Sequence, residues 1–189
     1  MFLRIKKINN IQYAYLVDNR WYKRRTKDKG KGSRQKVRKY LGRVYSFDKV
    51  EDKHFFDFKK IGNIEEYIEK NGKNGVIKGL VEWELFRHNI NKDEFDIDFI
   101  NKKILKCSKN SENFLAHKKS RSDFLVNKKE VSLAINEGFL NSYTLARLLD
   151  FKFGYDAEKA GLELAKYFVE AGIEVPKEVF VGIFGKVYK

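Results

Sequence analysis

Residues 2–42 decide the architecture of the N-terminal quarter of this chain, and they read FLRIKKINNIQYAYLVDNRWYKRRTKDKGKGSRQKVRKYLG. β-Branched and aromatic side chains recur between Arg and Lys throughout the stretch, which is typical of strands that keep one face in solvent. Turn residues separate the strand-like segments at short intervals. The pattern predicts an antiparallel β-meander of three or four strands.

Local turn signals divide the meander. The Asn pair at 9–10 and the Asp-Asn pair at 18–19 each predict a tight turn, so residues 20–25 are expected to form a strand of their own. The segment 26–33 has two glycines and no apolar residue, and we expect a loop there. Strand character then resumes, and Gly42 is expected to interrupt the last strand.

The charge of the chain is concentrated in this region. Residues 1–46 hold fifteen Lys or Arg and two Asp, a net charge of +13, whereas residues 47–189 hold twenty-five basic and twenty-four acidic residues. Such asymmetry indicates a part that faces nucleic acid joined to a neutral part. We therefore expect a basic β-rich nucleic-acid-binding module at 1–48 and a mixed α+β domain at 49–189, with a soft boundary that also allows one compact unit.

Runs of charge are usually solvated surface, and lysine-rich composition also accompanies thermal stability. In that usage Lys is balanced by Glu, as in residues 47–189 but not in residues 1–46. The imbalance favours a polyanionic partner, with DNA as the first choice and RNA as the second. An anionic membrane is disfavoured because no basic amphipathic helix accompanies the charge.

Cations on strands can neutralise phosphates, and aromatic rings between them can stack on bases. Strand alternation predicts that Lys36, Arg38 and Tyr40 share one face. Trp21 and Tyr40 are the expected stacking residues. The predicted nucleic-acid-binding residues are Arg4, Lys6, Arg20, Trp21, Lys23, Arg24, Arg25, Lys27, Lys29, Lys31, Arg34, Lys36, Arg38, Lys39 and Tyr40.

The same stretch resembles the N-terminal segment of some insertion-sequence transposases with a DDE catalytic domain. The resemblance rests on the basic and tyrosine-rich strands, on RQKV at 34–37 and on YLG at 40–42. It covers residues 2–42 and implies a β-rich DNA-contacting module. It does not imply transposase activity, because three metal-binding carboxylates in the expected context are not found in the remainder.

The remainder predicts an α+β fold with a helical C-terminal third. Asn63 is a helix N-cap signal, and Gly72 is a stop signal. Clean alternation at 95–99 predicts the first strand of a β-hairpin. The expected helices are 63–72, 75–89, 141–151, 156–172 and 176–188, and the expected strands lie in the hairpin at 95–108 and at 113–117 and 123–127.

Two carboxylates in that hairpin, Asp96 and Asp98, lie near several lysines. This grouping leaves a metal-dependent nuclease or a recombination or transposition enzyme as an alternative. The spacing argues against this alternative, because alternation with apolar residues makes these carboxylates the polar face of a half-exposed strand. We therefore favour a protein without catalytic residues, metal or cofactor. Another alternative is an RNA-binding protein of the translation machinery.

Glu84 and Arg87 are expected to form surface ion pairs on a helix.

The last two helices have a helix–turn–helix outline, but the second is too apolar to read base edges. It is expected to pack into the core, with a homodimer as an alternative if Val179, Phe180 and Phe184 are exposed.

The single cysteine, Cys107, excludes an intrachain disulfide. No apolar run approaches the roughly 18 residues that span a membrane, and a cytoplasmic protein is expected.

Overall fold

The structure is a computed structural model that describes residues 1–22, 32–108, 127–152 and 156–187. It is an α+β fold with strands first and helices last, as the sequence predicts. Its strands are β1 (Phe2–Ile8), β2 (Ile11–Tyr22), β3 (Gly32–Ser46), β4 (Phe95–Asp98), β5 (Lys103–Ser108), β6 (Asn127–Ile135) and β7 (Gly138–Leu140). Its helices are α1 (Phe55–Lys59), α2 (Ile64–Arg87), α3 (Ser142–Leu149), α4 (Ala157–Ala171) and α5 (Lys177–Val187).

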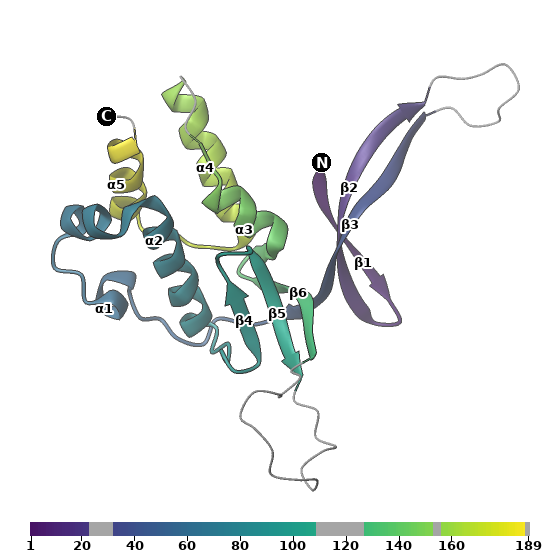
Figure 1. Cartoon of the computed structure of the whole chain (residues 1–189), viewed down its shortest axis with the longest axis horizontal. Helices are drawn as coiled ribbons and strands as arrows, with labels where there is room; N and C mark the ends of the chain where they lie inside the picture. The colour runs from purple at the N-terminus through teal and green to yellow at the C-terminus, as the bar shows by residue number, and fades with distance from the viewer. Residues whose placement is uncertain (23–31, 109–126, 153–155, 188–189) are drawn as a thin grey trace, which may run out of the picture.

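The described strands form a sheet in the order β1-β2-β3-β6-β5-β4, and β7 pairs with β6. The β3–β6 pair is parallel, while the neighbours on both sides are antiparallel. The partner of Phe2 in β1 is Val17, so β2 and β3 run beyond β1 as a two-stranded ribbon. Figure 1 shows this ribbon extending from the sheet on the side away from the helices.

Asn9 and Asn10 connect β1 to β2 with φ of 48° and 64°. Two successive positive φ angles are the geometry of a tight hairpin turn, and Asn tolerates them well. The turn predicted at 9–10 is therefore confirmed. The turn predicted at 18–19 is wrong, because Asp18 pairs with Lys36 and β2 continues as one strand to Tyr22. Ladder pairing with β3 outweighs the local turn preference there.

β3 passes through Gly42 without ending, so the predicted interruption is wrong. Gly42 has a φ of 97°, and a Cβ at this position would lie 2.1 Å from the backbone oxygen of Glu130. Glycine here lets β3 bulge and still approach β6 closely. The register with β2 shifts twice, between Ala14 and Tyr15 and between Leu16 and Val17.

Two hydrophobic clusters fill the described structure. The smaller one lies on one face of the N-terminal strands and includes buried Leu16 and Leu41, with Phe139 and Tyr143 packed against it. It joins β2 and β3 to β7 and α3. The larger cluster draws on α2, β6 and the C-terminal helices, for example Leu80, Leu133, Leu148, Leu164 and Ile183.

Helix boundaries follow the predicted caps. The Asn63 side chain accepts a hydrogen bond from the backbone of Glu65 (2.9 Å) at the start of α2. Gly72 lies inside α2 with φ of 63° and ψ of 177°, so the helix is kinked at the predicted stop.

The expected strand at 113–117 and most of that at 123–127 lie outside the described residues. No helix in the described part of the chain has the length and apolar character needed to span a membrane.

Candidate nucleic-acid interface

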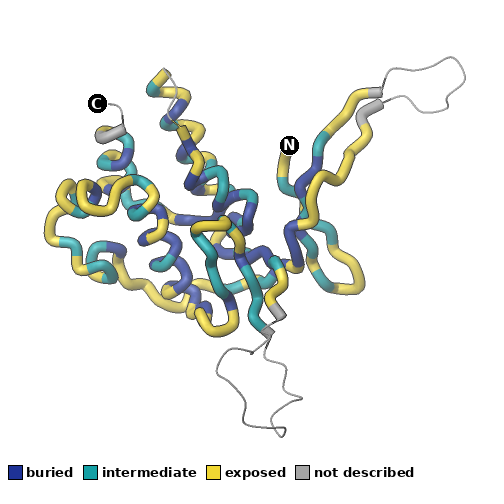
Figure 2. The backbone as a smooth tube through the Cα atoms, viewed as in Figure 1, coloured by how far each residue is buried: buried dark blue, intermediate teal, exposed yellow. Residues whose placement is uncertain are grey.

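The ribbon beyond β1, residues 18–22 and 32–38, is named here the basic ribbon. Arg20 pairs with Arg34 and Asp18 with Lys36 across its two strands. Since directly paired residues share a face, these four side chains lie on one face of the ribbon. Figure 2 shows that most of the ribbon is exposed. One face therefore presents several cations to solvent at a site projecting from the body.

Asp18 is the single acidic residue of this face, since residues 1–46 contain no other carboxylate except Asp28. Its Oδ2 accepts a hydrogen bond from Nη2 of Arg38 at 2.8 Å, and Nε of Arg20 lies 4.0 Å away. The hydrogen bond from Arg38 lowers the pKa of Asp18 below its ordinary value. The carboxylate thus stays ionised and orients Arg38, while the ribbon keeps a net positive charge.

The predicted grouping of Lys36, Arg38 and Tyr40 on one face is wrong. Lys36 pairs with Asp18, whereas Tyr40 pairs with Tyr15, and these partners alternate to opposite faces of β2. The cause is the register shift between Leu16 and Val17, which adds Arg38 to β3 as an extra residue. Alternation counted along one strand cannot reveal such a bulge.

A second surface lies at the root of the ribbon, on the face of β1–β3 opposite Leu16. The register places its residues in two rows across the three strands, and we name it the tyrosine face. Its members are Arg4, Lys6, Tyr13, Tyr15, Tyr40 and Arg43. The Tyr40 ring centroid lies 5.4 Å from that of Tyr15 and 6.3 Å from that of Tyr13. The Nζ of Lys6 lies 5.2 Å from the Tyr15 centroid.

The remaining predicted residues differ in position. Trp21 is 72% exposed in the outer part of the ribbon. Lys39 points to the body instead, where its Nζ donates to Oε1 of Glu130 (2.9 Å) and to Oγ of Ser142 (3.1 Å). The others lie outside the described residues, namely Lys23, Arg24, Arg25, Lys27, Lys29 and Lys31.

The carboxylates of the alternative nuclease site have structural partners. Oδ2 of Asp96 accepts from Nζ of Lys128 at 2.8 Å. Asp98 ends β4 and accepts from the backbone N–H groups of Ile100 (3.0 Å) and Asn101 (2.9 Å), so it stabilises the β4–β5 turn. Within residues 1–22, 32–108, 127–152 and 156–187, no group of three or more His, Cys, Asp or Glu side chains is placed to hold one metal ion.

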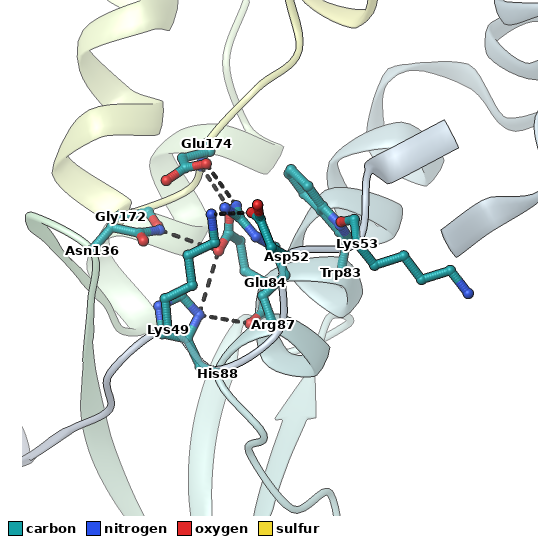
Figure 3. A network of polar contacts seen from close by, with 10 residues as sticks. All are labelled: Lys49, Asp52, Lys53, Trp83, Glu84, Arg87, His88, Asn136, Gly172 and Glu174. Atoms are coloured by element: carbon teal, nitrogen blue, oxygen red, sulfur yellow. Dashed lines mark hydrogen bonds and ion pairs between the residues drawn. The ribbon is translucent and has the colours of Figure 1, made fainter. Parts of the chain in front are cut away.

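A buried polar network lies in the body (Figure 3), and sequence reasoning missed it. Glu84 is fully buried, and its Oε1 accepts from Nη1 of Arg87 and from the backbone of Glu174, both at 3.0 Å. Its Oε2 accepts from Nδ2 of Asn136 at 3.1 Å. Arg87 also lies 2.7 Å from Oε2 of Glu174. Burial raises the pKa of Glu84, against the opposing effect of Arg87.

The expectation of a surface ion pair for Glu84 and Arg87 is therefore wrong. The signal was available, because Glu84 falls in the apolar stripe formed by Ile77, Leu80 and Val81 at helical spacing. A carboxylate within such a stripe indicates a buried charge that needs partners. The network joins α2 to the β6–β7 turn and to the α4–α5 connection. Because Glu84 is fully buried, we interpret the network as a contribution to the stability of the fold and not as a binding site.

An apolar groove of about 710 Å³ lies between α4, α5 and their connection, lined in part by Phe168, Val169 and Phe180. Val179, one of the residues named for a homodimer, is fully buried. Phe180 and Phe184 are half-buried and pack on the core. The homodimer remains a prediction.

Comparison with known proteins finds no matching family model, no similar curated protein and no similar solved structure.

Proposed function

We propose that this protein is a non-enzymatic DNA-binding protein that contacts the phosphates of duplex DNA through the basic ribbon. The observation that carries the proposal is the cationic face of this projecting ribbon, where Arg20, Arg34 and Lys36 share a face with one carboxylate. Each Lys or Arg that meets a phosphate releases condensed counterions, so the arrangement favours a polyanion.

The shape of the ribbon supports DNA over RNA. A two-stranded β-ribbon fits the B-DNA major groove, which is about 12 Å wide. The major groove of A-form RNA is too narrow and deep for side chains to enter. The resemblance of residues 2–42 to a transposase DNA-contacting segment points the same way. The cytoplasmic location expected from the sequence is part of this proposal.

The test is binding of a labelled blunt DNA duplex, followed by fluorescence anisotropy over a salt series. We expect the logarithm of the affinity to fall linearly with the logarithm of salt concentration, with a slope of about −0.9 for each phosphate neutralised. The double variant Arg20→Gln/Lys36→Gln should lower the affinity about tenfold or more at low salt and make the slope shallower.

The matched control is Lys70→Gln/Lys177→Gln, which removes two charges from exposed positions on α2 and α5. It should leave affinity and slope close to those of the wild type. The proposal is overturned if the duplex does not bind at low salt, if the salt slope is flat, or if the control loses as much affinity as the ribbon variant. A duplex RNA of the same sequence should bind more weakly.

A further inference from the structure

We propose that the tyrosine face binds unpaired nucleotides, so that the protein recognises a junction between duplex and single-stranded DNA. This inference rests on the proposed function, because the duplex part of the junction is assigned to the basic ribbon. It adds a second binding surface with its own ligand class.

The first support is the arrangement of the rings. Tyr40 is 49% exposed, and the Tyr13 and Tyr15 rings beside it are half-buried. The interplanar angles to Tyr40 are 42° and 50°, so the rings are tilted and do not stack on one another. Trp21 lies on the same face of β2 by alternation. A strand face with several accessible rings is a platform on which bases can stack.

The second support is the charge around the rings. Arg4 and Arg43 are exposed at the two sides of the tyrosines, and Lys6 lies over Tyr15. β1, β2 and β3 place no carboxylate among them, since Asp18 points to the opposite face with Arg38. The Tyr40 hydroxyl is neutral near pH 7, and burial raises its pKa further above the ordinary value of 10.0, so the ring brings no negative charge beside a phosphate. Rings flanked by cations match a nucleotide strand, which has bases and phosphates in alternation.

The ring faces select for unpaired bases, because in a duplex each base face is already covered by its neighbours in the stack. The same ring platform therefore adds little to the binding of a blunt duplex. Tyr15 precedes Asp18 by three residues on β2, which places the two surfaces about 10 Å apart along the strand at 3.3 Å per residue. The two surfaces lie on opposite faces of these strands, so a DNA whose duplex takes the ribbon into its groove must pass around the edge of the ribbon for its single-stranded end to reach the tyrosine face.

The test compares three labelled DNAs with the full-length protein: a blunt duplex, the same duplex with an oligothymidine tail of about ten nucleotides, and the tail alone. We expect the tailed duplex to bind about tenfold more tightly than the blunt duplex. A fluorescent base analogue in the tail should lose emission on binding, because stacking on a ring quenches it.

Tyr40→Ala is the main variant, since Tyr40 is the most exposed ring of the tyrosine face. It should abolish the gain from the tail and the quenching, and leave the affinity for the blunt duplex unchanged. Tyr40→Phe keeps the ring and should keep both. Lys6→Gln, which removes a cation without removing a ring, should reduce the gain and leave the quenching. Blunt-duplex affinity serves in each case as the control for folding.

The inference is overturned if wild type binds tailed and blunt duplexes equally, or if Tyr40→Ala weakens both to the same extent. In either case the proposed function stands, because duplex binding is retained. If the tail alone binds and the blunt duplex does not, the proposed function fails and recognition of a junction fails with it, and only single-strand binding by the tyrosine face stands. If none of the three DNAs binds, both proposals fail.

Discussion

The basic ribbon and the buried network around Glu84 both combine arginine with carboxylate, and they differ in how far these charges are buried. In the ribbon, Arg20 and Arg38 share Asp18 in an exposed position. In the network, Glu84 is enclosed and each of its oxygens accepts hydrogen bonds. Exposed ion pairs contribute little to folding, whereas removing one partner of a buried pair is costly. The comparison separates charges that are available for binding from charges that hold the fold.

The largest effect is expected for Glu84→Ala. Arg87 and the backbone of Glu174 would lose a buried acceptor, and we expect a loss of about 3–5 kcal/mol in the free energy of unfolding. Glu82→Ala is the control on the same helix, because Glu82 forms a partly exposed ion pair with Lys59. It should cost no more than about 1 kcal/mol. Urea denaturation measures both, and equal losses would contradict the contrast between buried and exposed pairs.

A second large effect is expected for Gly42→Ala, at the point where the ribbon strand β3 meets the body. The added Cβ would clash with the backbone of Glu130 and force a non-glycine residue to a φ of 97°. We expect a loss of about 2–3 kcal/mol of stability. Gly62→Ala, with no atom near its new Cβ, should be close to neutral. Thermal unfolding of the two variants would show whether the bulge tolerates a side chain.

A smaller effect concerns pH. Burial raises the pKa of Glu84 in the folded state above its ordinary value of 4.5. The stability that this group contributes is therefore fully present below pH 4.5 and is lost as the pH rises through the raised pKa. Glu84→Gln should lack this decrease, so the advantage of the wild type over Glu84→Gln should shrink toward neutral pH. Parallel pH profiles from urea denaturation would exclude this titration.

The smallest effect is expected for Asp18→Asn in the ribbon. Removal of the carboxylate leaves Arg20 and Arg38 without their shared anion, and affinity for duplex DNA should rise about threefold at low salt. The midpoint of urea denaturation should not change. A weaker affinity would mean that the main effect of Asp18 on binding is to orient Arg38. The carboxylate of the ribbon would then have a positioning role like that of Glu84 in the buried network.

Local features of the fold were predictable from the sequence, and features that depend on distant partners were not. The turn at 9–10 and the cap at Asn63 follow from side chains that act on their own neighbours. The continuity of β2 through Asp18 depends on pairing with β3, and the bulge at Gly42 depends on β6.

The same limit applies to the candidate site. The cations of the ribbon could be located from the composition, because charged residues can be counted without knowing how the strands pair. The placement of Lys36 and Tyr40 on opposite faces could not be predicted, because it depends on a register shift that only the paired strands reveal. The partners of Glu84 on the β6–β7 turn and the α4–α5 connection are likewise separated from it by many residues of chain.

The parallel pairing of β3 with β6 has a consequence for the order of folding. β1, β2 and the ribbon can form early, since antiparallel hairpins close short loops. Arg43 finds its partner Val131 only after the whole segment between them has been synthesised and brought back. Loop closure over such a separation is slow. Attachment of the ribbon to the body is therefore expected to be a late step, and the ribbon to exist as a hairpin before it has a fixed base.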